Sequence, residues 1–376
     1  MLFSEVIGHA NLKANLIRNA KSGAIPHAQL FLGQSGSGAL PLALAYAQFL
    51  HCENPLDNDA CGQCAACNKS RQLIHPDTHF TYPFIPNPDI KKKSDEKPIA
   101  SDWMAQWRKF LETHAYPDVY DWMDAMAVEN KQLNITSAEC AEIIKHSNLK
   151  SFESKYKVFI IWMPEYLDKE GNKLLKLLEE PPADTIFLLV AEDEKSILAT
   201  ILSRTQLTRI PPLAESDIAE ALLKQGVPAN QANQVARLSE GNYRLAQDLL
   251  HTNDFGFEQL LIDWWGIILQ NRKGDFVAFA DQFSKLGREK QKYLIIGAIS
   301  LLRQALMLQQ MRQPSALWNE QEQAVCTALA QRLQLKQFDR IVSLLTKLHG
   351  YVERNGNTKL LGLNACIHIA RIIHHS

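Results

Sequence analysis

AQLFLGQSGSGALPLALAYAQFL, residues 28–50, is the stretch that decides the fold. Ala28–Leu32 is a short apolar run of the kind that forms a buried strand, and the glycine-rich loop Gly33–Leu40 follows it directly. Pro41 then opens a run rich in alanine and leucine, which favours a helix. The stretch therefore predicts a strand, a glycine loop and a helix in succession.

Strand and helix patterns alternate on both sides of this stretch. Val158–Ile161 and Ile186–Val190 are further apolar runs typical of buried strands. Helical spacing occurs at residues 9–22, at 135–149 with Ser137 as an expected cap, and at 169–178 before Pro181 and Pro182. This alternation predicts an α/β domain with a parallel sheet and flanking helices over about residues 1–212.

The remainder of the chain has helical patterns. Residues 213–252 contain short helical segments separated by glycine and proline, and they predict a small helical lid domain. Residues 253–376 carry long segments with broad apolar faces, which predict an all-α domain. Such faces suit oligomerisation, although a plain buried helical core explains them equally well.

An insertion is expected at about residues 79–132. Asp77–Lys97 contains prolines and aromatic residues without periodicity, and the run KKKSDEK at 91–97 is expected to be a solvated loop rather than a DNA site. Helices are expected around Trp103–His114 and Asp118–Ala127.

Composition excludes several classes of protein. Of the 376 residues, 46% are hydrophobic and 22% charged, and we find no apolar run near the roughly 18 residues that span a bilayer. The amino-terminal residues do not resemble a secretory signal, so we expect a cytoplasmic protein with reduced thiols. A net charge of -1 provides no general attraction for nucleic acid. DNA contacts would be local, through basic residues such as Lys155, Lys157 and Arg209.

The glycine loop lacks the side chains of a working phosphate site. Gly33, Gly36 and Gly38 allow close backbone approach, but Ala39 replaces the lysine that binds phosphates and Leu40 replaces the hydroxyl that binds magnesium. We therefore expect no functional ATP site in this chain. Taken alone, the motif favours a fortuitous glycine turn between a strand and a helix.

The second strand also lacks the expected acids. Val158–Ile161 leads into Trp162 and Met163, where a working ATPase would carry carboxylates for magnesium and water. Glu165 is the nearest acid, and the intervening Pro164 displaces it.

Four of the seven cysteines are crowded into one segment. Cys52, Cys61, Cys64 and Cys67 form a C-x8-C-x2-C-x2-C arrangement, which predicts a closed, structural zinc site in a module at about residues 51–68. Four free thiols are the alternative. His51 is a competing ligand, but we expect it to be an exposed neighbour of the site.

Several motifs together resemble the clamp-loader branch of the AAA+ family. NKLLKLLEEPP at 172–182 precedes a strand and then TILSRTQ at 200–206. With IGHANLK at 7–13, HAQLFLG at 27–33, the cysteine cluster and HPD at 75–77, the match resembles the delta prime family of bacterial DNA polymerase III. It covers most of residues 1–250.

This resemblance implies an AAA+-like domain, a lid and a collar domain through which five subunits form a ring. It implies a subunit that does not hydrolyse ATP and that acts with ATP-binding motor subunits, a delta-like subunit, the sliding clamp and primer-template DNA. Ser203, Arg204 and Thr205 correspond to the family's SRC motif, with threonine in place of the cysteine. The resemblance implies that the motif's arginine enters the ATP site of the adjacent subunit. Sequence alone leaves open that Arg204 is an ordinary surface residue.

Two other functions remain possible from the residues. One is an autonomous ATPase with rearranged ligands. The other is a zinc-dependent nucleic-acid-binding protein unrelated to clamp loading, which the near-neutral charge disfavours.

Overall fold

The computed structural model describes residues 1–87, 90, 97–127, 132–251, 256–311, 320–353 and 356–374. The run at 91–97 therefore lies outside the described residues except for Lys97. The chain divides into two compact units: Met1–Val227 with Gly241–Leu245, and Pro228–Glu240 with Ala246–Ser376. The division into three domains at 212 and 252 stays a prediction.

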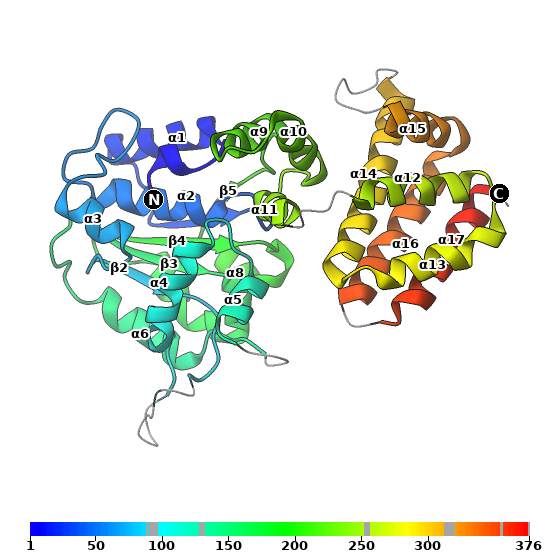
Figure 1. The fold of residues 1–376 in the computed structure, drawn as a ribbon. Coiled ribbons are helices and arrows are strands. Elements are labelled where there is room, and N and C mark those ends of the chain that lie inside the picture. Colours follow the sequence, from blue (N-terminus) through cyan, green and yellow to red (C-terminus); the bar gives the residue numbers. More distant parts are fainter. Residues whose placement is uncertain are drawn as a thin grey trace. The chain divides into compact units, whose positions relative to one another are not determined.

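A five-stranded parallel sheet forms the centre of the first unit, in the order β2-β3-β4-β1-β5 (Figure 1). In β1, Leu30 is paired with Leu189 of β4 on one side and with Leu207 of β5 on the other. The glycine loop therefore begins at the carboxyl edge of the sheet, between two neighbouring strands. The strands are β1 (Ala28–Leu32), β2 (Thr78–Thr81), β3 (Lys157–Trp162), β4 (Thr185–Ala191) and β5 (Gln206–Arg209).

The three strands expected from apolar runs are confirmed, whereas the start of the expected insertion is wrong. Thr78–Thr81 belongs to the sheet and pairs with Val158–Ile161. Threonine and phenylalanine both favour strands, but THFT is a four-residue segment without an apolar run, so the search for buried strands did not mark it. Asp77 fixes its position, because its carboxylate accepts N–H bonds from Glu153 (2.9 Å) and Ser154 (2.8 Å) in the loop before β3.

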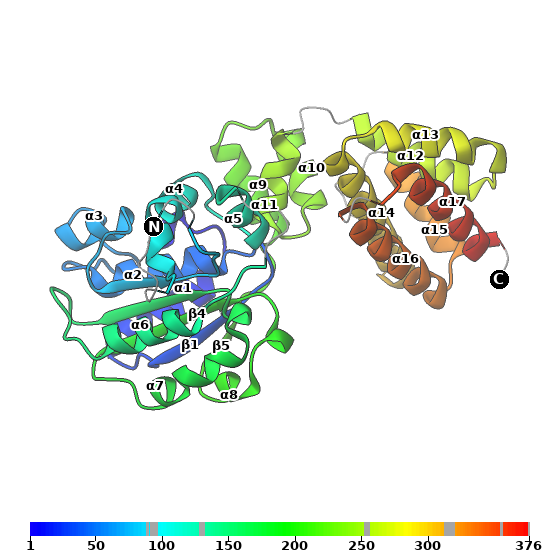
Figure 2. The same ribbon diagram turned by 90° about the horizontal axis from the view of Figure 1, so that it is seen from below.

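Helices cover both faces of the sheet, as Figures 1 and 2 show. Alternate strand residues divide between two cores: Ile160 packs with α2, and Phe159 packs on the opposite side with α6. The expected cap of α6 is corrected by one residue, since Thr136 accepts the capping bond from Glu139 N. Helices and helical turns of this unit are η1 (Phe3–Glu5), α1 (Ala10–Ser22), α2 (Ala39–His51), α3 (Ala65–Arg71), α6 (Ser137–Ser147), η3 (Pro164–Leu174), α7 (Leu175–Glu179), η4 (Glu194–Ser196), α8 (Ala199–Leu202) and α9 (Glu215–Lys224).

The tryptophan-bearing helices of the insertion form as expected and pack on the end of β3. They are η2 (Ala100–Trp103), α4 (Met104–Thr113) and α5 (Val119–Ala125). Trp107 stacks on Tyr82 with ring centroids 4.1 Å apart and lies 5.1 Å from Trp122 and 5.2 Å from Trp162. This aromatic cluster anchors the insertion firmly, and so positions the segment between α4 and α5.

The second unit is helical throughout its described residues, as its sequence predicts. Trp264 and Phe279 stack in its core with centroids 4.9 Å apart. Its elements are α10 (Ala229–Leu238), most of α11 (Tyr243–His251), α12 (Gly256–Leu269), η5 (Lys273–Asp275), α13 (Phe276–Lys285), α14 (Arg288–Met311), α15 (Glu320–Arg332), α16 (Leu335–Glu353) and α17 (Thr358–His374). Among the described residues, none of the helices combines the length and apolar character needed to cross a bilayer.

A buried ion pair joins α10 to α15 inside the second unit. Arg237 Nη2 lies 3.0 Å from Glu322 Oε1, and their side chains are only 8% and 10% exposed. Glu322→Ala removes the carboxylate from a buried guanidinium, which should lower the free energy of unfolding by about 3–5 kcal/mol in urea denaturation. Gln323→Ala, one residue away and exposed, should have little effect. Equal stability of the two variants would contradict the importance of the pair.

Candidate functional site

The glycine loop turns where β1 ends. Gly36 (φ 70°) and Gly38 (φ 95°) adopt left-handed conformations that glycine tolerates without strain. Gly38 precedes α2, and the first turn of that helix carries Ala39 and Leu40, which are 7% and 4% exposed. The positions at which a phosphate site needs lysine and a hydroxyl are thus occupied by buried apolar side chains.

The space beside the loop is nearly filled. A cavity of about 20 Å³ remains, lined by the loop, by the carboxyl end of β4 and by Tyr116 and Pro117 from the insertion. A single water needs about 10–15 Å³ on this measure, so the cavity has room for one water and none for a nucleotide. Nothing in the local sequence marked Tyr116 as part of this site, because its contacts with Ile7 and Tyr243 join segments far apart in the chain.

The end of β3 does not present a carboxylate to the cavity. Trp162 and Met163 are buried at 2% and 5% exposure. The carboxylate of Glu165 instead accepts N–H bonds from Glu192 (2.6 Å) and Asp193 (2.9 Å). Glu165 therefore holds the turn after β4, and it is absent from the cavity lining among the described residues.

Glu192 is a site residue that sequence reasoning missed. It follows β4 directly and lines the cavity. Burial, with the nearby carboxylates of Asp118 and Glu165, raises the pKa of Glu192 to about 8. In the absence of a bound cation, the surroundings of Glu192 therefore favour its neutral, protonated form.

Arg204 lies on the surface, paired within its own chain. It follows Ser203, the C-terminal cap residue of α8. Its Nε donates to Glu179 Oε2 at 2.9 Å, and its Nη1 donates to the carbonyl oxygen of Thr200 at 3.1 Å. The side chains of Arg204 and Glu179 are 31% and 58% exposed. Because such exposed pairs contribute only about 0.2–1 kcal/mol, the guanidinium can change partner at low cost.

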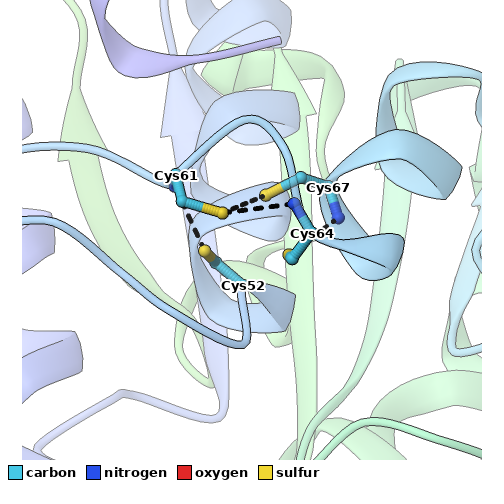
Figure 3. Close-up of side chains that lie close together, drawn as sticks. All are labelled: Cys52, Cys61, Cys64 and Cys67. Atoms are coloured by element: carbon cyan, nitrogen blue, oxygen red, sulfur yellow. Dashed lines mark hydrogen bonds between the residues drawn. The ribbon is translucent and has the colours of Figure 1, made fainter.

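The four predicted metal ligands come together, as Figure 3 shows. Their Sγ atoms all lie within 4.8 Å of one another, and those of Cys61 and Cys67 are 3.9 Å apart. Tetrahedral zinc with Zn–S bonds of about 2.3 Å requires sulfur atoms about 3.8 Å apart. Cys52, Cys61, Cys64 and Cys67 therefore fit a four-thiolate zinc site after small shifts.

The surroundings of the cluster suit thiolates. Cys61 N donates to Cys52 Sγ at 3.2 Å, and Cys64 N donates to Cys61 Sγ at 3.4 Å. Backbone N–H groups of Gln63 and Cys64 lower the pKa of Cys61 to about 6, whereas burial raises the pKa of Cys67. Metal binding would offset that burial, because a positive ion favours the charged form of each ligand.

His51 is not the exposed neighbour that the sequence predicted. It is only 4% exposed, and its ring nitrogens contact Ser154 Oγ and Thr78 Oγ1, each at 2.8 Å. Both nitrogens are thus engaged away from the cysteines.

Two of the basic residues considered for DNA contact, Lys157 and Arg209, differ in their exposure. Lys157 is 4% exposed and its Nζ donates to the carbonyl oxygens of His146 (3.0 Å) and Ser147 (3.1 Å) at the end of α6. It is therefore excluded as a surface contact. Arg209 pairs with Glu194 at 2.8 Å but remains 66% exposed.

Comparison with known sequences places this architecture in a family. The sequence model described as DNA polymerase III, delta subunit, matches residues 8–214, more than half of the chain. The chain belongs to this family. The resemblance drawn from its motifs is therefore confirmed.

Two relatives named DNA polymerase III subunit delta' are similar to this chain in sequence. DNA polymerase III subunit delta' of Bacillus subtilis is 24% identical over 350 residues, covering 91% of each chain. Subunit delta' of Pseudomonas aeruginosa is 30% identical over 59% of this chain and 55% of its own length. A crystal structure of a gamma subunit-related protein from Thermotoga maritima covers 96% of this chain at 14% identity with a TM-score of 0.40.

The raised pKa of Glu192 predicts a pH-dependent stability. Its folded pKa, about 8, exceeds the ordinary value of 4.5, so folding favours the protonated form and this contribution is lost as pH rises from about 4.5 through about 8. The free energy of unfolding should decline less steeply with rising pH in Glu192→Gln than in the wild type. One such group can contribute up to about 1.4 kcal/mol per pH unit to this decline. Urea denaturation at pH values from about 4.5 to about 8 measures this slope. Exposed Glu112→Gln should retain the wild-type slope, and the same slope in Glu192→Gln would refute the assignment.

Proposed function

We propose that this chain is a non-hydrolysing, delta-prime-like subunit of a DNA polymerase III clamp loader, which assists ATP-dependent loading of the sliding clamp and donates Arg204 to the ATP of a neighbouring subunit. Family membership supports the clamp-loader assignment, as do relatives named subunit delta', gamma and tau. The proposed lack of hydrolysis rests on the nearly filled space beside the glycine loop, which we call the cradle. The proposed donation in trans rests on the partly exposed guanidinium of Arg204.

The closed cradle supports the absence of hydrolysis by this subunit. Phosphoryl transfer depends on positioned cations that neutralise the charge developing on the phosphate oxygens. Here Ala39 and Leu40 replace the lysine and the hydroxyl, and Glu165 is bound to backbone N–H groups. The chain thus offers neither a magnesium site nor space for the nucleotide at its own loop.

The environment of Arg204 supports donation in trans. Its side chain lies in a Ser-Arg-Thr segment that matches the family's SRC motif, and its only strong partner among the contacts described is the exposed carboxylate of Glu179. A phosphate group carries more charge than one carboxylate and accepts the guanidinium's fork of donors. A neighbouring ATP would therefore compete well for Arg204.

Arg204→Ala tests this role in the clamp-loader complex reconstituted from full-length subunits. The variant should assemble normally but show lowered DNA-stimulated ATP turnover, because an arginine finger contributes about 10³–10⁵ to the rate at the site it serves. Turnover and assembly are measured together, by phosphate release and size-exclusion chromatography.

Arg272→Ala is the matched control, since Arg272 is also a surface arginine paired with a single carboxylate, that of Asp275. It should leave turnover at the wild-type level. Arg204→Lys should remain impaired, because lysine keeps the charge but loses the fork of donors. Wild-type turnover in Arg204→Ala would remove the finger role.

Zinc bound by the four cysteines would be structural. Four thiolates close the coordination sphere and leave no open position for a water or substrate. The segment between Cys52 and Cys61 also contacts the amino-terminal residues, because the carboxylate of Asp59 accepts N–H bonds from Phe3 and Ser4, both at 2.9 Å. A metal at this site would therefore stabilise the attachment of α3 and of η1 to the sheet domain.

Cys64→Ala should abolish stoichiometric zinc binding and lower the thermal midpoint of the first unit, because metal affinity is coupled to folding. Elemental analysis should find about one zinc per wild-type chain. Cys140→Ala provides the control, as Cys140 is buried outside the cluster and should retain the metal. Equal zinc content in wild type and Cys64→Ala would exclude these ligands.

The remaining expectations extend the same proposal. They are a helical lid at 213–252, a collar domain at 253–376, a hetero-pentameric ring with motor and delta-like subunits, contact with clamp and primer-template DNA through that ring, and a cytoplasmic location. ATP turnover by the isolated chain would favour an autonomous ATPase instead. Tight, steeply salt-dependent DNA binding by the isolated chain would favour a zinc-dependent nucleic-acid-binding protein.

A further inference from the structure

Tyr116 of the insertion lies against the glycine loop. Its Cε1 atom is 3.0 Å from the position that a Cβ on Gly38 would occupy. Its hydroxyl accepts an N–H bond from Ile7 at 2.7 Å, and its ring meets that of Tyr243 edge to face with centroids 4.9 Å apart. At 7% exposure, the side chain is a packed part of the cradle wall.

Two carboxylates from the same segment hold Arg244. Asp121 accepts two bonds from the guanidinium, Nε to Oδ2 and Nη2 to Oδ1, both at 2.6 Å. Asp118 Oδ2 lies 3.0 Å from the same Nε. The side chains of Asp118 and Asp121 are only 14% and 11% exposed. A bidentate pair in such surroundings is much stronger than an exposed surface pair.

These carboxylates also shape the helix that carries them. Asp118 accepts the backbone N–H of Asp121 at 2.9 Å, and Asp121 accepts that of Asp118 at 3.0 Å, so the two form a reciprocal cap at the start of α5. The grip on Arg244 and the start of α5 therefore depend on the same side chains.

The residues around Arg244 contact the glycine loop from the other side. Tyr243 N donates to the carbonyl oxygen of Gly36 at 3.0 Å. Asn242 packs so closely that a Cβ on Gly36 would lie 1.8 Å from its Oδ1 atom. Gly241–Leu245 and the loop belong to one compact unit.

We infer that the segment Tyr116–Asp121 is a built-in ligand of the glycine loop, which fills the cradle and ties Gly241–Leu245 to it without a nucleotide. The amino-terminal end of α2 and the guanidinium of Arg244 are each groups that attract anions. In this chain the phenol ring of Tyr116 occupies the space, and two carboxylates neutralise Arg244. This arrangement does not require Arg204 to serve a neighbour.

Amide hydrogen exchange in the full-length chain tests the inference. Asp118→Asn with Asp121→Asn, and separately Tyr116→Ala, should raise exchange about 10- to 100-fold at Ser37 and Leu42 beside the loop and at Tyr243. Tyr120→Ala is the matched control, because Tyr120 lies on α5 but is 66% exposed. It should leave these amides unchanged. Exchange in β3 and β4, which lie in the core of the same unit, reports whether each variant remains folded.

Arg244→Gln removes the guanidinium that Asp118 and Asp121 bind. It should raise exchange at the start of α5 and in the glycine loop together. An increase confined to α5, or an equal effect of Tyr120→Ala, would overturn the inference. So would protection of the wild-type loop by a non-hydrolysable ATP analogue, since an open cradle would then exist. Because the exchange variants are tested without ATP turnover, their failure would leave the role proposed for Arg204 standing.

Discussion

The candidate site depends on the close packing of neighbouring side chains against two glycines, which have no side chain of their own. Gly38 leaves just enough room for the ring of Tyr116, and Gly36 leaves just enough for Asn242. A Cβ on Gly36 would collide with Asn242, and one on Gly38 would press against the ring of Tyr116. Both glycines also have left-handed φ values that other residues rarely adopt. The glycines of a phosphate loop are therefore still required here, although the space they create is filled by the protein itself.

Two arginines in the first unit show how environment separates structural from transferable guanidinium groups. Arg244 is bound by Asp118 and Asp121, whose side chains are largely buried, so releasing it would leave charges in a poorly solvated place. Arg204 is bound by one carboxylate that is 58% exposed, so water can replace the contact readily. The first arginine suits a permanent internal tie, and the second suits a partner that arrives with assembly.

Local sequence patterns predicted the features that local physics determines. Residues close together in the sequence determine the apolar runs of β1, β3 and β4, the glycine loop and the cysteine cluster. These features formed as expected. The strand Thr78–Thr81 was missed because its four residues form no apolar run, although Thr and Phe favour strands, and because its pairing with β3 is not visible in the local sequence. The approach of Tyr116 and the partners of Arg244 were missed for a related reason, since residues more than 100 positions apart meet there. The burial of His51 and Lys157 likewise depends on distant contacts.

The central claim is that Tyr116 fills the space beside this chain's glycine loop, while Arg204 is available to the ATP of a neighbouring subunit. The most direct measurement is an experimental structure of the assembled clamp loader with a non-hydrolysable ATP analogue. The account predicts Tyr116 in the cradle of this chain and the Arg204 guanidinium within about 3 Å of a phosphate oxygen bound to the adjacent subunit. A nucleotide in this chain's own cradle, or Arg204 still paired with Glu179 and remote from every nucleotide, would contradict it.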